Sequence, residues 1–281
     1  MTKLFALALA AVSSAACAQM PATNSMPDGS RDMYVGLGAA SKPRYEGGGE
    51  RETAALPVLQ VQWSNGLFVS GMRAGIHLSR APQLEFGPLL ELQPRRDAEG
   101  EGDSVGGVEG ARFSMVMMPL AAPSGNRLAG MPAVHSRVQG GGFLNYYLTP
   151  DWRFTSSLLY GAGNARKGLK LELGVQRLAV ELGAHHRLAL DAGLTFANRR
   201  YNNAFFGVGE SDSFNSANPM FDAAGGLKDV HLGARWNWAW SPSWMLTSGV
   251  QAARLQGSAR KSPLVERPTN LTVSTAIAYR F

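Results

Sequence analysis

Hydrophobic positions recur at every second residue along most of the chain, and this alternation predicts β-strands. Successive side chains of a strand point to opposite faces, so a period of two marks one apolar and one polar face. The segment "VHLGARWNWAW" is typical. Its apolar face carries Val230, Leu232, Ala234, Trp236, Trp238 and Trp240. "WRFTSSLLYG" (152–161) and the final "TNLTVSTAIAYRF" alternate in the same way. The pattern indicates an all-β protein.

Twelve segments are predicted as strands, and most have the length of about nine to twelve residues that a tilted strand needs to cross a bilayer. They are 33–40, 54–63, 67–78, 84–93, 111–118, 134–148, 152–163, 168–181, 186–198, 228–240, 244–256 and 270–281. Bacterial membrane barrels have an even number of antiparallel strands. We therefore predict one transmembrane β-barrel of 12 strands over residues 33–281, with 10 strands as the alternative.

Two features of this strand assignment stand out. Segment 111–118, "ARFSMVMM", alternates least and could belong to a long loop. The triplet Gly140-Gly141-Gly142 predicts a bulge or a sharp bend inside its strand.

The connections between predicted strands are of two kinds. Residues 149–151, 183–186 and 241–243 are tight, whereas 199–227 and 257–269 are long and polar. In outer-membrane barrels the short turns face the periplasm and the long loops face outside, so we expect both long loops outside. If 111–118 is a strand, residues 94–110 fall on the periplasmic side, which is an awkward place for so long a connection.

Aromatic residues gather beside the predicted short turns. This set is Trp152, Trp236, Trp238, Trp240, Trp244, Tyr279 and Phe281. A girdle of aromatic side chains is typical of the membrane–water interface of a barrel. A soluble β-sandwich with tryptophans in its core is the alternative, but it leaves the terminal Phe281 and the strand lengths unexplained.

The first residues have the pattern of a secretory signal peptide. Lys3 precedes an apolar run, and Ala16-Cys17-Ala18 forms a cleavage site, so we predict a leader over 1–18 and a lead-in over 19–32. A lipoprotein signal at Cys17 would need a large apolar residue at Ser14. Cys17 is the single cysteine, so the mature chain would have no disulfide.

Composition agrees with export but does not identify an activity. Charged residues are 17% of the chain, below the roughly 25% of a soluble domain. The net charge is +6, yet no basic run or RNA-binding signature occurs, so nucleic acid is not an expected partner.

No catalytic, cofactor or metal site is predicted, and the chain is not expected to be an enzyme. The alternating acids of "RRDAEGEGD" (95–103) lack the calcium-loop pattern. Two other functions stay open. Arg137, Arg153, Lys170 and Arg235 could face a lumen and favour anions in a small pore. A hydrolase could use His231 with Asp229, although no nucleophile motif accompanies them.

Several segments resemble the MipA/OmpV family (MltA-interacting protein). They are "PRYEGG" (43–48), "LPVLQVQWSNGLFV" (56–69), "RLAGMPAVHSRVQGGGFLNYYL" (127–148), "YNNAFFGV" (201–208), "GGLKDVHLGARWNW" (225–238), "SWMLTSGVQAARLQGSARKSPLV" (243–265) and the final "IAYRF". The match is most specific at Phe206, Gly207 and Val208, and again at Ser262 and Pro263. Ser258 stands where the family usually has an acid, and residues 97–126 look longer than the family norm.

The resemblance implies a non-enzymatic barrel of the outer membrane, in contact with lipid and lipopolysaccharide. It also implies a scaffold role between a lytic murein transglycosylase and a murein synthase, or a role in membrane permeability. The family brings no catalytic residues to this sequence. The alternating C-terminal strand that ends on Phe281 resembles the signature read by the barrel-assembly machinery.

Overall fold

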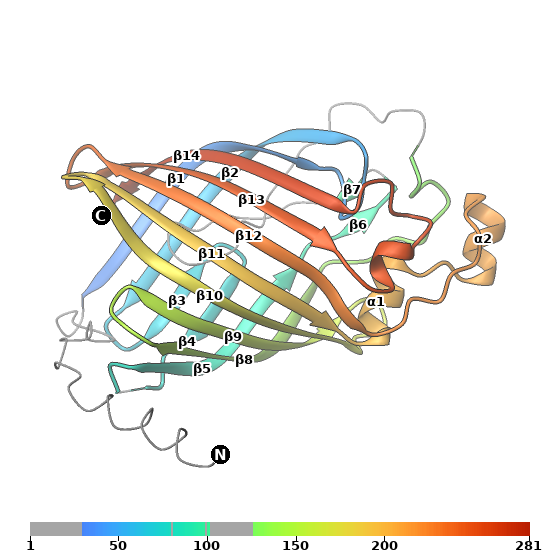
Figure 1. Cartoon of the computed structure of the whole chain (residues 1–281), viewed down its shortest axis with the longest axis horizontal. Coiled ribbons are helices and arrows are strands. Elements are labelled where there is room, and N and C mark those ends of the chain that lie inside the picture. The colour runs from blue at the N-terminus through green and yellow to red at the C-terminus, as the bar shows by residue number, and fades with distance from the viewer. Residues whose placement is uncertain (1–29, 80, 99, 102–125) are drawn as a thin grey trace, which may run out of the picture.

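The computed structural model describes residues 30–79, 81–98, 100–101 and 126–281. Twelve antiparallel strands close into a single barrel, as the alternation predicted (Figure 1). The barrel strands are β1 (Arg31–Pro43), β2 (Arg51–Trp63), β3 (Leu67–Ser70), β4 (Arg73–Ile76), β5 (Leu84–Gln93), β8 (Arg137–Tyr147), β9 (Trp152–Ala162), β10 (Gly168–Gly183), β11 (His186–Ala197), β12 (Gly226–Ala239), β13 (Trp244–Leu255) and β14 (Thr269–Arg280). The expected strand number is confirmed, and the alternative of ten is wrong.

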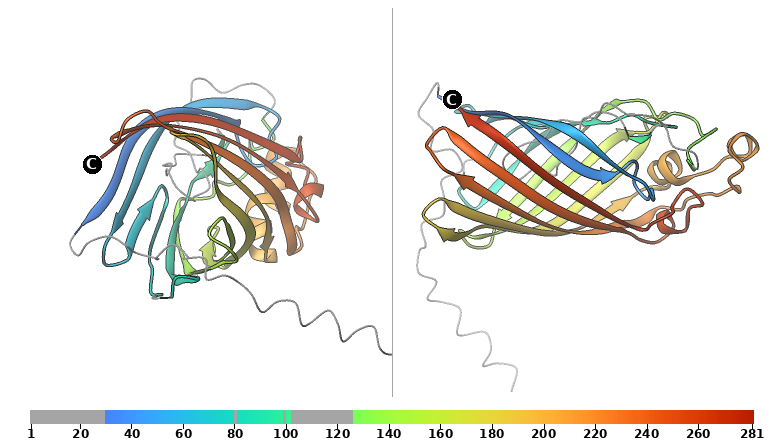
Figure 2. Two further views of the ribbon diagram at one scale, coloured as in Figure 1. Left: turned by 60° about the vertical axis from the view of Figure 1, so that its left-hand side comes forward. Right: turned by 90° about the horizontal axis from the view of Figure 1, so that it is seen from above.

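The ring closes where the first strand meets the last. β1 pairs with β14 from Tyr34–Arg280 to Ser41–Val273 and with β2 on its other side. One end of the barrel holds the short connections 148–151, 184–185 and 240–243 and the C-terminus; we call it the turn end. The opposite end holds 44–50, 94–98, 126–136, 198–225 and 256–268; we call it the loop end. Figures 1 and 2 show the C-terminus and the two α-helices at opposite ends.

Outward positions of the strands are apolar and exposed, which is the inverse of a soluble core. Leu37 is 65% exposed, Val138 64% and Leu232 61%, and similar side chains surround the barrel. The inward positions of the same strands are buried and mostly polar, such as Gln139 on β8 and Glu172 on β10. A barrel that is apolar outside and polar inside follows directly from the alternation.

The predicted strand 67–78 is wrong, because the structure has two strands there. β3 and β4 form a hairpin in which Ser70 pairs with Arg73 across Gly71 and Met72. Gly71 has a φ of 58°, a left-handed conformation that glycine adopts without strain. This hairpin adds one strand to the ring, while the predicted strand 111–118 lies outside the described residues.

The long connection after β5 lies at the opposite end of the barrel from the one expected with 111–118 as a strand. β5 pairs directly with β8, so residues 94–98 lie at the loop end and not among the short turns, as the sequence had suggested. There Arg96–Asp97 (β6) pairs with Gly100–Glu101 (β7). The connection after β5 therefore shares one end with the two long connections predicted from the sequence, and the awkward topology disappears.

The glycine triplet of β8 forms no bulge, contrary to expectation. Gly140, Gly141 and Gly142 pair in unbroken register with β5 and β9. A Cβ at Gly141 would lie 1.8 Å from the carbonyl oxygen of Leu158. Glycine is needed because the neighbouring backbone approaches closely.

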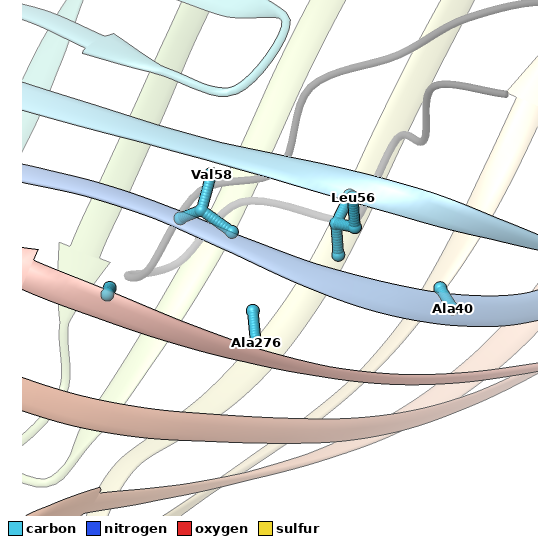
Figure 3. Packing of buried hydrophobic residues seen from close by; sticks show 5 residues of the cluster. Ala40, Leu56, Val58 and Ala276 are labelled. Atoms are coloured by element: carbon cyan, nitrogen blue, oxygen red, sulfur yellow. The ribbon is translucent and has the colours of Figure 1, made fainter.

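One part of the inner wall is apolar. Leu56 and Val58 of β2, Ala40 of β1, and Ala276 and Ala278 of β14 are buried together (Figure 3). The small side chains of β1 and β14, the two strands that close the ring, leave room inside the barrel for the larger Leu56 and Val58 of β2.

Short helices occur only in connections of the loop end, within the described residues. They are α1 (Arg199–Phe206), α2 (Glu210–Ser216) and the 3₁₀ turn η1 (Ala259–Lys261). Asn198 caps α1, because its side chain accepts a hydrogen bond from the Tyr201 amide at 2.8 Å. No helix among the described residues has the length and apolar content to cross a membrane.

Candidate functional site

The loop end is filled by a packed core that we call the loop cap. Its first cluster joins four connections through Tyr45, Leu128, Met131, Val208 and Leu264, all buried. Its second cluster is Phe206, Ala223, Leu255 and Ala259. Phe221 packs against both clusters, so they form one unit. Connections that bury such residues are structural elements of this barrel rather than free loops.

The residues that carry the family resemblance lie inside the loop cap. The hydroxyl of Ser262 donates to the carbonyl of Phe206 at 2.7 Å, which ties the connection before β14 to the end of α1. Val208 exchanges backbone hydrogen bonds with Phe221 at 2.8 and 2.9 Å. Pro263 lies between Ser262 and the buried Leu264, and Gly207 follows α1 directly. The sequence singled out these positions without showing that they touch.

The segment "PRYEGG" reaches the same cap from the other side of the seam. The Tyr45 hydroxyl lies 3.0 Å from both the Leu264 carbonyl and a Glu266 carboxylate oxygen. The amides of Glu266 and Arg267 donate to the Gly47 carbonyl at 2.8 and 3.0 Å. Burial raises the pKa of the Tyr45 phenol well above its usual range, and Glu266 adds to the shift.

Below the loop cap, four charged side chains form a network inside the barrel. Arg73 lies 2.6 Å from Glu91 and 2.9 Å from Glu172, and Lys170 lies 2.7 and 3.1 Å from the same two acids. Arg73 is on β4 and Glu172 on β10, four strand positions apart in the ring. The contact therefore crosses a chord of the lumen instead of following its wall.

A second group of charges extends the network to β12, two strands beyond β10 in the ring. Asp229 of β12 lies 3.1 Å from Lys228, and Lys228 also contacts Glu46 in the β1–β2 connection. Thr195 of β11 donates to Asp229 at 3.0 Å and is in register with both Glu172 and Asp229. We call the two groups together the charged layer. Alternating charges of this kind satisfy one another and need no mobile ions.

Between the charged layer and the turn end lies a cavity of about 850 Å³, which we call the chamber. Its lining reaches the turns 184–185 and 241–243 but includes no residue of the loop cap. Five arginines and three carboxylates line it: Arg73, Arg153, Arg187, Arg235, Arg280, Glu85, Glu172 and Asp191. The chamber thus carries charged side chains of both signs among apolar ones and extends to the turn end.

The four cations that could favour anions have different surroundings. Arg153 and Arg235 line the chamber. Lys170 is held in the charged layer by Glu91 and Glu172. Arg137 begins β8 at the loop end and does not line the chamber. The alternation predicted that these four side chains point inward. It could not predict how far along the barrel axis each of them lies.

His231 lines the chamber in an arrangement that differs from a Ser-His-Asp triad. Its Nδ1 lies 3.1 Å from Asp229, as a triad histidine would. The Thr195 hydroxyl, however, donates to the carboxylate of Asp229, which is the acid and not the base. This group therefore lacks the order of nucleophile, base and acid. No cluster of three potential metal-ligating side chains occurs in the part of the chain that the structure describes.

Aromatic rings form a continuous row along the turn end. The rings of His186, Trp236 and Trp238 lie in mutual contact, with centroid distances of 5.6, 5.7 and 6.3 Å. The row continues through Trp240, Trp244, Tyr279 and Phe281, each centroid within 6.2 Å of the previous one. Trp152 stands apart at the start of β9, where Arg177 lies 5.8 Å from its ring. The tryptophans, Tyr279 and Phe281 of the sequence prediction all lie at this end.

Several solved structures are similar to the chain over most of its length. They include a KdgM porin (10% identity, 90% of this chain and 99% of that chain, TM-score 0.38). A bacterial polysaccharide outer membrane secretin matches at 9% identity, covering 89% and 98%, with a TM-score of 0.44. An outer membrane channel from Pseudomonas putida F1 matches at 12% identity, covering 92% and 97%, with a TM-score of 0.41. No curated protein sequence matches the chain.

A family model covers nearly all of the barrel. The model of MltA-interacting protein MipA matches residues 35–281, from the first strand to the last residue. This range contains the loop cap, the charged layer and the chamber. The chain belongs to the family of MltA-interacting protein MipA.

Proposed function

We propose that this protein is an outer-membrane β-barrel that acts as a non-enzymatic adaptor for murein-degrading and murein-synthesising enzymes. The observation that carries the proposal is the contrast along the barrel axis. The loop cap packs at one end of the barrel and the charged layer crosses the lumen, whereas the lining of the chamber extends to the turn end. Such a barrel suits binding from one side better than passage between two sides.

The outer surface supports the membrane location. Apolar side chains are exposed around the barrel, and the aromatic row lies at one rim, as in barrels that span a bilayer. In this proposal residues 1–18 are removed as a signal peptide, and lipid and lipopolysaccharide surround the strands. The turn end then faces the periplasm, because bacterial barrels place their short turns there.

The family supports the choice of partner. Its description names an interaction with MltA, a murein transglycosylase, and the turn end is the side from which such an enzyme could dock. Here the turns are short, so a partner would contact the rim and the mouth of the chamber.

Fractionation followed by co-purification tests the proposal. The tagged protein is expected in the outer membrane, to run faster on gels before boiling than after, and to retain murein enzymes. An unrelated barrel purified in parallel is the control. Equal recovery of murein enzymes on both barrels would contradict the adaptor role, and absence from the outer membrane would contradict the location.

A small pore is the second candidate, because Arg153, Arg187 and Arg235 line the chamber. Planar-bilayer recording separates the two functions. The adaptor proposal expects a silent bilayer, since the charged layer and the loop cap lie in series with the chamber. Steady anion-selective current would favour the pore.

A hydrolase using His231 is the third hypothesis. If His231 were a catalytic base, His231→Ala would abolish any ester or glycoside hydrolysis by the purified barrel. We expect the purified barrel and the variant to be equally inactive.

A further inference from the structure

We propose that the chamber is a binding site for a short oligosaccharide that enters from the turn end. The inference concerns a ligand of the barrel itself, so it stands whether or not murein enzymes dock at the rim. The volume of about 850 Å³ is in the range of roughly 300–1,000 Å³ that small-molecule sites occupy.

One wall of the chamber offers aromatic rings. Phe68 of β3, His77 of the β4–β5 turn and Phe143 of β8 lie with centroids 4.7, 5.2 and 5.7 Å apart. All three line the chamber. Rings held against each other in this way form a rigid apolar surface. The C–H face of a sugar ring packs against such a surface without losing its hydroxyl contacts at the edge.

A fixed hydrogen-bonding network lies beside these rings. Tyr147 and Asn145 donate to Glu85 at 2.7 and 3.1 Å. Arg153 donates twice to Gln176, at 2.7 and 3.2 Å, and reaches Glu85 at 3.5 Å. Each of these planar groups is thus held in one orientation on rigid strands, which is the preorganisation that a binding site requires.

The opposite wall is kept open by glycine. A Cβ at Gly193 would lie 2.5 Å from His231 Nε2, and a Cβ at Gly233 would lie 2.3 Å from an Asp191 oxygen. Both polar side chains therefore lie flat against the strands instead of filling the lumen. Asp191 and the exposed Arg187 line the chamber from this wall.

The balance of charges favours a neutral polyhydroxylated ligand. The lining has both signs, five arginines and three carboxylates, together with amide side chains such as Asn145, Gln176, Asn237 and Gln251. A sugar hydroxyl donates one hydrogen bond and accepts others, so it needs both kinds of partner. Three of the arginines already lie within 3.5 Å of carboxylates, Arg73 of Glu172, Arg153 of Glu85 and Arg280 of Asp32, so an acidic peptide would have to compete with acids already in place.

Calorimetric titration of the folded full-length barrel in detergent tests this inference. The probes are chitotriose and maltotriose as neutral saccharides and hexaglutamate as an acidic peptide. Phe143→Ala removes part of the aromatic wall, and Asp191→Asn changes an acceptor on the opposite wall. The matched control is Leu144→Ala, because Leu144 is the neighbour of Phe143 but points outward and is exposed. A heat-shift gel verifies folding of every variant.

At least one trisaccharide is expected to bind, with affinity reduced tenfold or more in both chamber variants and unchanged in Leu144→Ala. Absence of heat with both sugars overturns the inference, as does saccharide binding that both chamber variants retain. Binding of hexaglutamate alone would assign the chamber to acidic peptides instead. No murein enzyme is present in this experiment, so its outcome is independent of the adaptor test.

Discussion

The two ends of this barrel are built by opposite means. At the loop end, long connections bury Phe206, Leu264 and Tyr45 in a packed core and lock to one another by hydrogen bonds. At the turn end, connections such as 148–151 and 240–243 are too short to bury a core of their own, and rings such as Trp240 and Trp244 face outward. The comparison shows that the long connections cover one end of the barrel with a packed core. The short turns leave the chamber accessible at the other end.

Phe206→Ala is expected to have the largest effect, because it should destabilise the loop end and leave the turn end unchanged. A buried phenylalanine replaced by alanine typically costs about 3–5 kcal/mol because a cavity remains. We expect the loop cap to open separately from the barrel, and hydrogen exchange in α1 and residues 221–223 should then speed up by about a hundredfold or more. Phe214→Ala is the control, because Phe214 of the same connection is 93% exposed. Equal effects of the two variants would contradict a packed cap.

The charged layer separates the two ends, and Glu172→Ala tests it. The substitution leaves Arg73 and Lys170 with Glu91 as their shared acid, and breaking a buried ion pair costs about 3 kcal/mol or more. Urea unfolding of the barrel in detergent should show the loss. Glu181→Ala is the matched control, since Glu181 lies on the same strand but is exposed near the turn end. Unchanged stability of Glu172→Ala would mean that water replaces the ion pairs.

Ser262→Ala is expected to weaken the cap less than the loss of Phe206. It removes the 2.7 Å hydrogen bond to the Phe206 carbonyl, and a buried group left unpaired costs about 1–3 kcal/mol. Limited proteolysis of the loop end should become faster while the heat shift of the barrel persists. Ser211→Ala, on the exposed helix α2, serves as the control. Identical proteolysis rates of both variants would show that the Ser262 hydrogen bond does not stabilise the cap.

The smallest effect is a pH dependence confined to the loop end. Burial raises the pKa of Tyr45, so the neutral phenol stabilises the cap fully below the unfolded pKa of about 10. This contribution is lost as the pH rises from there towards the folded pKa. Protease resistance of the cap should therefore fall above about pH 10, and Tyr45→Phe should remove that fall. A decline that persists in the variant would point to another group.

Alternation predicted the strands well because lipid and lumen impose opposite demands on neighbouring residues. It failed at 67–78 for a physical reason. Across the two-residue turn at Gly71 and Met72 the alternation changes phase, so Ser70 and Arg73, three residues apart, pair on the same face. That change of phase beside a glycine was the available signal. The wrong end for residues 94–98 has a separate cause, because it depended on counting 111–118 as a strand, whereas β5 pairs directly with β8.

The interior was less predictable than the wall. The inward direction of Arg153 and His231 follows from the sequence, but the partners of Lys170 do not. Glu91 and Lys170 are 79 residues apart and meet only because the sheet closes on itself. The packing of "PRYEGG" against Leu264 and Glu266 depends on closure in the same way. Contacts across a ring require its size and shear, and these are not local properties.

The seam between the first and last strands has a consequence for the order of assembly. A Cβ at Gly36 or Gly38 would lie 2.2 or 2.1 Å from carbonyl oxygens of β14, so the two strands fit only while β1 carries no side chains there. Until β1 and β14 pair, the sheet has two unpaired edges, and such edges invite pairing with other chains. Pairing of β1 with β14 therefore removes both exposed edges at once. A bulkier residue at Gly36 would hinder this pairing and leave the edges exposed to other chains for longer.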